Sequence, residues 1–291
     1  MNANIASELF PYASSEFSVD GHTMRYIDEG SGDQTILCVH GNPTWSFYYR
    51  RVIERFSATH RVIAVDHLGC GRSDKPKGDA CLYRFASHRD RLVRLIEHLD
   101  LNQVTLLAHD WGGAIGLSAL LKSQSRFERI MLLNTGAFIP PFIPLRISAC
   151  RIPVLGSLGV RGANLFAGAA IRMAMSRQRL SDHARRGLLA PYGNWANRIA
   201  IDRFVKDIPM NRKHPTYGEL ESLGQSLGTL SEMPSLLVWG MRDWCFRPEC
   251  LRRFQLEWPN AKSLEIADAG HYVIEDAPEE TLGAISDFLS V

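Results

Sequence analysis

The segment 104–113 combines an apolar run with a residue that could act as a nucleophile. Its sequence, VTLLAHDWGG, places Asp110 between a run typical of a buried strand and a pair of glycines that can open a helix. A sharp strand–turn–helix of this kind exposes one side chain above a sheet, and that residue is usually a serine. An aspartate has no proton to lose at neutral pH and can attack a carbon directly. The alternative interpretation of Asp110 is an N-cap of the following helix.

Two later segments hold residues that could complete such a site. Asp243 follows the apolar run 235–239, where the orienting carboxylate of a hydrolase triad is expected. His271 lies in an Ala-Gly-His turn after the last predicted strand. We therefore predict that His271 is the base that activates water and that Asp243 fixes its tautomer. Asp268 and Asp276 are the alternative partners for His271.

Asn42 and Trp111 could hold an anion beside Asp110. The sequence VHGNP directly follows a predicted strand, in the position of the loop that supplies one backbone N–H of an oxyanion hole. We expect that N–H to belong to Asn42 and the second to belong to Trp111. Their side chains, an amide and an indole, are also donors and suit a leaving halide. A turn before proline and core packing are the respective structural alternatives.

Composition excludes several classes of protein. The chain has 291 residues, of which 45% are hydrophobic and 22% charged, with a net charge of +2, so disorder and nucleic-acid binding are not expected. The six cysteines form no C-x-x-C pair and are interpreted as reduced thiols. No metal-ligand spacing occurs, and no metal or cofactor is expected. Without a signal-peptide pattern or a run of ~18 apolar residues, the expected location is the cytoplasm, as a soluble protein.

Strand-like and helix-like segments alternate along most of the chain. A hairpin is predicted over residues 18–27, followed by six buried strands. Helical spacing of apolar residues predicts helices at 83–99 and 278–289. The six strands are expected at residues 35–39, 61–65, 104–108, 129–133, 235–239 and 262–266. This alternation predicts an α/β fold with a mostly parallel eight-stranded sheet and helices on both faces.

The stretch 137–225 interrupts this alternation and is predicted to be an inserted helical cap domain. Residues 1–136 and 226–291 would then form the core domain. The stretch contains thirteen basic residues and five acidic ones, which is explained either by a basic face toward a partner or membrane or by solvated arginines. Residues 151–164 are apolar enough to cover a long-chain substrate, to pack in the core or to form an oligomer contact. A homo-oligomer and contact with a membrane surface both remain open.

Together these motifs resemble the α/β-hydrolase superfamily and, within it, the third subfamily of haloalkane dehalogenases. The likeness covers nearly the whole chain and depends on the sequences HGNPTWSFYYR, DHLGCGRSDKP, AHDWGG, WGMRDWCF and AGHYVIED. In another subfamily the acid is a glutamate after the preceding strand. Here that strand ends in Asn134-Thr-Gly-Ala without a carboxylate, which favours Asp243.

The resemblance implies a two-step hydrolysis of a small apolar haloalkane. Asp110 displaces halide to form an alkyl ester while Asn42 and Trp111 hold the halide ion. His271, paired with Asp243, then activates water against the ester. The products are an alcohol, halide and a proton, and no cofactor takes part.

Other activities use the same residues. Relatives of this subfamily look like β-lactone decarboxylases of bacterial olefin synthesis, in which the aspartate is again central. Epoxide hydrolases also use an aspartate nucleophile but need cap tyrosines, for which Tyr192 and Tyr217 are candidates. A receptor or scaffold without activity is the non-enzymatic alternative. All five site positions nevertheless hold chemically competent residues.

Overall fold

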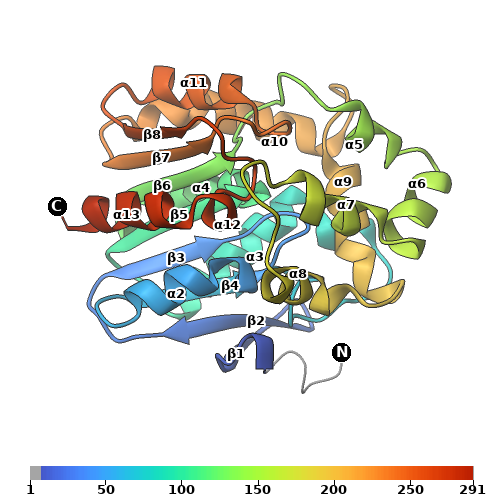
Figure 1. Ribbon diagram of the computed structural model, residues 1–291, viewed down its shortest axis with the longest axis horizontal. Helices are drawn as coiled ribbons and strands as arrows, with labels where there is room; N and C mark the ends of the chain where they lie inside the picture. Colours follow the sequence, from blue (N-terminus) through green and yellow to red (C-terminus); the bar gives the residue numbers. More distant parts are fainter. Residues whose placement is uncertain (1–7, 291) are drawn as a thin grey trace.

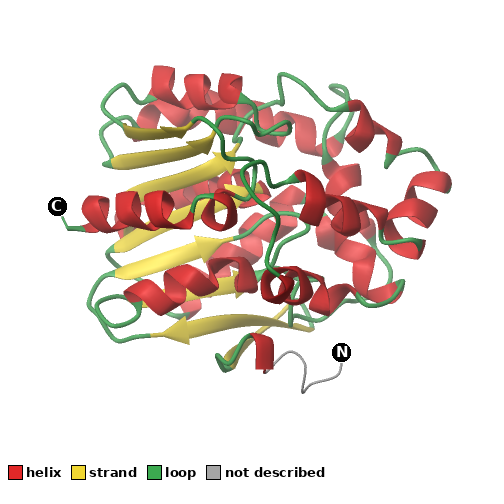
Figure 2. Ribbon diagram, in the orientation of Figure 1, coloured by secondary structure: helices red, strands yellow, loops and turns green. Residues whose placement is uncertain are grey.

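An eight-stranded sheet forms the centre of the structure, which is a computed structural model describing residues 8–290 (Figures 1 and 2). The strand order is β1-β2-β4-β3-β5-β6-β7-β8. Strand β2 is antiparallel to both of its neighbours, β1 and β4, and all other neighbouring strands are parallel to each other. The strands are β1 (Ser14–Val19), β2 (His22–Glu29), β3 (Thr35–Val39), β4 (Arg61–Asp66), β5 (Val104–Asp110), β6 (Phe127–Thr135), β7 (Ser235–Gly240) and β8 (Lys262–Ile266). The predicted fold class is confirmed. Residues 1–7, part of the segment in which no signal peptide is expected, lie outside the described range.

The central strands are buried on both faces, which explains their unbroken apolar sequences. Every residue of β3 and β5 is buried, whereas exposed and buried residues mix along β1. Strands β3 and β8 have the predicted bounds. Strands β5 and β6 are longer than predicted, because the polar residues Asp110 and Thr135 still pair after the apolar run has ended, beyond a register shift that follows His109. Apolarity therefore marks the middle of a strand better than its end.

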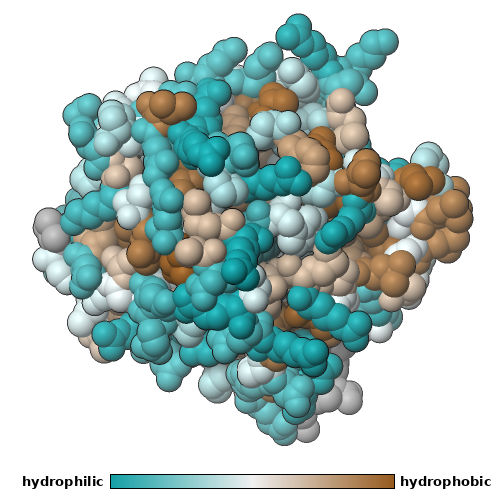
Figure 3. All heavy atoms as spheres, turned by 45° about the horizontal axis from the view of Figure 1, so that its top comes forward, coloured by the Kyte–Doolittle hydropathy of each residue, from teal (hydrophilic) through white to brown (hydrophobic). Residues whose placement is uncertain are grey.

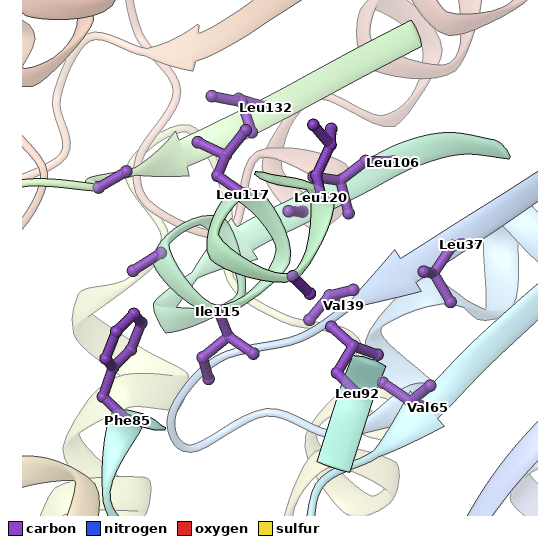
Figure 4. Close-up of a cluster of buried hydrophobic side chains, with 14 of the residues drawn as sticks. Leu37, Val39, Val65, Phe85, Leu92, Leu106, Ile115, Leu117, Leu120 and Leu132 are labelled. Carbon is purple, nitrogen blue, oxygen red and sulfur yellow. The ribbon is translucent and has the colours of Figure 1, made fainter. Parts of the chain in front are cut away.

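Helices cover both faces of the sheet and bury two separate apolar clusters. Figure 4 shows the first cluster, in which side chains of α4, such as Ile115 and Leu120, lie beside sheet residues such as Leu106. One face carries α3 (Phe85–His98), α4 (Trp111–Lys122) and α11 (Pro248–Glu257), and the other carries α2 (Arg50–Phe56), α12 (Val273–Asp276) and α13 (Pro278–Leu289). The predicted helix over 278–289 has the observed bounds. The predicted helix over 83–99 begins later, after the short 3₁₀ helix η2 (Ala80–Tyr83).

Between β6 and β7 the chain forms a group of short helices at the end toward which the parallel strands point (Figure 1). These helices are α5 (Leu145–Ala149), α6 (Leu155–Ser157), η4 (Leu158–Gly162), α7 (Leu165–Met173), α8 (Asp182–Leu189), α9 (Ile199–Asp207) and α10 (Pro215–Ser226). Helix α10 also packs against α3 and α4 of the core. We keep the name cap for residues 137–225. Among residues 8–290, no helix has the length and apolarity needed to cross a membrane.

Candidate active site

The turn between β5 and α4 holds Asp110 in a strained backbone conformation above the sheet. Its φ of 55° and ψ of −132° lie outside the regions that non-glycine residues normally adopt. Its side chain makes no capping hydrogen bond to α4, so the N-cap alternative does not account for its position. Such backbone strain costs ~1–3 kcal/mol and occurs mainly at functional sites. Gly41 leaves the space that the Asp110 side chain occupies, because a Cβ there would overlap it.

His271 and Asp243 lie directly beside Asp110. Nδ1 of His271 is 2.7 Å from Oδ2 of Asp243, and its Nε2 is 3.5 Å from Oδ2 of Asp110. Asp243 follows β7 and His271 precedes α12, so the ends of three parallel strands bring the three side chains together. All three are buried, with exposed fractions of 6% for Asp110, 7% for His271 and 3% for Asp243.

The two predicted anion-holding residues also lie at Asp110. The backbone N–H of Asn42 donates to Oδ1 of Asp110 at 2.6 Å. The side-chain amide of Asn42 donates to the carbonyl of Ile201 in the cap at 3.3 Å. Asn42 and Trp111 both line the pocket that contains Asp110. All five predicted site residues therefore meet in one place.

The charges in this site depend on one another. Burial alone would lower the pKa of His271, but the negative charges of Asp243 and Asp110 outweigh it and raise the pKa to about 10. Burial would raise the pKa of the Asp110 carboxyl, but the hydrogen bond and charge of His271 hold it below its usual value. In the free protein at neutral pH, a histidinium therefore lies between two carboxylates.

The structure adds two buried residues that the sequence interpretation missed. The amide of Asn134, at the end of β6, donates to Oδ2 of Asp243 at 3.0 Å, and its oxygen accepts from the N–H of Gly240. The ring of His109 lies 4.4 Å from that of His271, and its Nε2 is 3.0 Å from the His271 carbonyl. Both are polar residues at the carboxyl end of a buried strand, and this position in the sequence could have marked them as candidate site residues. Both residues position the pair formed by His271 and Asp243.

A pocket extends from Asp110 into the cap. Its empty volume, which includes the open solvent at its mouth, is about 1020 Å³. The cap lines it with apolar side chains, including Phe138, Phe142, Ile147, Phe166, Val205, Ile208 and Leu220. Of the three interpretations of residues 151–164, substrate cover is not supported, because none of these residues lines this pocket. Periodicity indicated helices there but did not tell which side they bury.

The alternative residues lie elsewhere. Asp276 accepts backbone N–H groups from the chain around Arg177, and Asp268 pairs with the Arg177 side chain. Neither is a partner of His271. Tyr192 is buried against the carbonyl of Thr44, and neither it nor Tyr217 lines the pocket, so the proton donors expected of an epoxide hydrolase do not reach Asp110.

Comparison with known proteins places this architecture in a family. A model of the alpha/beta hydrolase fold matches residues 34–278, so the chain belongs to the α/β-hydrolase fold family. The resemblance predicted from the sequence is confirmed.

Two kinds of enzyme are similar over nearly the whole chain. The cis-3-alkyl-4-alkyloxetan-2-one decarboxylase of Shewanella oneidensis is 38% identical over 286 residues, which cover 97% of this chain and 90% of that protein. Haloalkane dehalogenase 2 of Mycobacterium tuberculosis is 32% identical over 283 residues, which cover 96% of this chain and 95% of that protein. The tetrameric structure of a haloalkane dehalogenase from Paraglaciecola agarilytica matches with a TM-score of 0.83 and 28% identity, covering 97% of this chain and 95% of that one.

Proposed function

We propose that this protein is a β-lactone decarboxylase, which converts an oxetan-2-one with two alkyl substituents into an alkene and carbon dioxide. The observation that carries the proposal is the nucleophilic position of Asp110 in a pocket whose remaining walls are mostly apolar. Such a pocket suits a small reactive ring that bears two hydrocarbon chains. The 38% identity with a cis-3-alkyl-4-alkyloxetan-2-one decarboxylase supports the same substrate class.

The proposed reaction begins with Asp110 as the nucleophile. Oδ2 of Asp110 attacks the alkyl-substituted ring carbon that is bonded to the ring oxygen, and not the carbonyl carbon. A carbon–oxygen bond to Asp110 forms while the bond between that carbon and the ring oxygen breaks, which leaves an alkyl ester and a free carboxylate. The carbon–carbon bond between the neighbouring carbon and its carboxylate then breaks with release of carbon dioxide. The electron pair of that bond forms the double bond to the carbon that carries the ester. The ester bond to Asp110 breaks at the same time and restores its carboxylate. Neither water nor a proton is consumed.

The surrounding residues stabilise the charge that moves during this reaction. The side chains of Asn42 and Trp111 donate to the carboxylate released by ring opening. His271 remains protonated because its pKa is raised, and its positive charge lies beside the same anion. Asp243 and Asn134 hold the ring of His271 in place.

Exchanging Asp110 for asparagine tests this assignment. Asp110→Asn keeps the size of the side chain but removes the nucleophile, so alkene formation from a cis-3,4-dialkyl β-lactone, followed by gas chromatography, is expected to fall by about a thousandfold or more. Asp268→Asn, which alters an exposed carboxylate outside the pocket, is the matched control and should retain full activity. Alkene formation by Asp110→Asn at the wild-type rate, or none by the folded wild type, would refute the proposal.

Haloalkane hydrolysis is the second candidate, because Asn42 and Trp111 offer two side-chain donors beside Asp110. In this reaction Asp110 displaces a halide, and water must then attack the alkyl ester. Ester formation neutralises one of the two carboxylates that raise the pKa of His271, so the histidine can lose its proton and act as the base. Bromide release from bromoalkanes by the same two variants measures this activity alongside alkene formation.

A further inference from the structure

A strip of exposed apolar side chains runs over the cap outside the catalytic pocket. The strip spans α5, α6, η4 and the start of α7, and its side chains are between 48% and 85% exposed. Figure 3 shows apolar atoms gathered at the edge of the molecule where α6 lies in Figure 1. Water-exposed apolar groups of this size and number usually mark an interaction surface. The strip consists of Leu145, Ile152, Val154, Leu155, Leu158 and Leu165.

The segment that carries this apolar strip has basic residues and no acidic ones. Residues 129–181 contain no Asp or Glu. Arg146 follows Leu145 in α5, and Arg161 lies in η4 with Leu158. Arg172 lies on the same face of α7 as Leu165, two turns further on. Within residues 8–290, none of these three arginines forms an ion pair with a carboxylate. The surface is therefore apolar and positively charged at once.

The strip is continuous with the opening of the catalytic pocket. Phe142 and Trp244 line both that pocket and a shallow groove beside it. Leu145, which is 85% exposed and the first residue of the strip, lines the same groove. The guanidinium of Arg247 lies 3.8 Å from the ring centre of Phe142, and that of Arg146 lies 5.3 Å from the ring of Trp244. An apolar path edged by cations thus leads from the pocket to the outer face of the cap.

We propose that this face of the cap docks on a lipid bilayer that contains anionic lipids, with the pocket opening turned toward the membrane. The exposed leucines would enter the headgroup region, and the arginines would bind lipid phosphates. A second copy of the chain is a poorer occupant, because symmetric pairing of this face would place arginine against arginine, and the nearest carboxylate, that of Asp202 beneath α6, is buried. The surface lies outside the reaction site, so the inference stands whether that site opens a lactone or displaces a halide.

Co-sedimentation with vesicles tests the docking. The wild type is expected to bind vesicles of phosphatidylcholine mixed with phosphatidylglycerol more strongly than vesicles of phosphatidylcholine alone, and to be released as salt screens the charges. The double variant Leu155→Gln/Leu158→Gln, and separately Arg172→Gln, are expected to need about tenfold more anionic lipid for half-maximal binding. None of these residues lines the pocket, so turnover of a short-chain substrate in solution should not change.

Two control variants show whether the effect belongs to this face. Leu256→Gln removes an equally exposed leucine from α11, and Arg252→Gln removes an exposed arginine from the same helix. Both are expected to bind lipid like the wild type. The proposal is overturned if the wild type binds no anionic vesicles, if the cap variants bind as well as the controls, or if the strip instead holds a concentration-dependent oligomer that Leu155→Gln/Leu158→Gln dissociates.

Discussion

At the scale of single residues, the charge of His271 is set by two carboxylates that act together. Asp243 contacts Nδ1 and Asp110 lies near Nε2, and their combined charge outweighs burial and raises the pKa of His271 to about 10. His109, whose ring lies tilted against the same imidazole, has its pKa lowered to about 3 by burial and by the charge of His271, so it stays neutral. Only one of these two neighbouring histidines is therefore charged at neutral pH.

Removing the charge of Asp243 should move this equilibrium. Asp243→Asn keeps a side chain of the same shape but deletes the larger of the two carboxylate charges acting on His271. We expect the pKa of His271 to fall by more than about one unit, equivalent to ~1.4 kcal/mol. Titration of the imidazole by nitrogen-15 NMR measures it directly, with Asp268→Asn as the control. A pKa still near 10 in Asp243→Asn would show that Asp110 alone controls His271.

The sequence predicted which side chains meet in the site but not what holds them. Asp110 and His271 lie in motifs whose strand–turn context can be recognised from neighbouring residues. Asn134 was noted only for lacking a carboxylate, because its contact with Asp243 joins residues 109 positions apart in the chain. Its φ of 28°, unusual for any residue but glycine, cannot be inferred from one sequence either. Such contacts depend on the register between strands, which local patterns do not specify.

At the scale of elements, the buried strands and the helical character of residues 137–225 were predicted, but the bounds and buried faces of the cap helices were not. Strands β3 and β8 have the predicted bounds, because turn residues end their runs. The cap consists of short helices separated by 3₁₀ and π turns, so few of them complete the repeats that periodicity requires. For the segment 151–164, substrate cover, core packing and an oligomer contact were all open; in the structure Val160 is buried, whereas Val154 and Leu155 are exposed. The apolar residues of a helix predict burial only when the element against which the helix packs is already known.

The junction of β5 and α4 offers a test at this scale. A Cβ on Gly112 would overlap the backbone carbonyl of Val39 in β3, which the sheet prevents from moving. Gly112→Ala is expected to lower the free energy of unfolding by ~1–3 kcal/mol and to displace Asp110, with a matching loss of activity. Gly218→Ala, in α10 with no atom within 4 Å, should instead raise it by up to ~1 kcal/mol. Urea unfolding distinguishes the two, and equal stability of both variants would contradict this account.

For the molecule as a whole, buried histidines determine how stability depends on pH. Burial lowers the pKa values of His40, His67 and His88 below that of an unfolded chain, ~6.5. As the pH falls below ~6.5, these three histidines bind protons in the unfolded chain but not in the folded one. Each of the three histidines therefore lowers the free energy of unfolding by up to ~1.4 kcal/mol per pH unit. His271 acts oppositely, because its raised pKa adds stability that is complete below pH ~6.5 and is lost as the pH rises toward 10. Stability should therefore be greatest near neutrality.

Replacing one of these histidines should reduce the sensitivity to acid. The ring of His88 stacks on Phe204 at 4.6 Å, and neither ring nitrogen has a hydrogen-bond partner within residues 8–290. His88→Phe keeps the stacking and removes the group that must stay neutral, so its Tm should fall less between pH 7 and pH 5 than that of the wild type, by ~2–4 °C for each kcal/mol retained. His98→Phe, at an exposed position of the same helix, is the control. If Tm fell equally in all three proteins, groups other than His88 would have to cause the acid sensitivity.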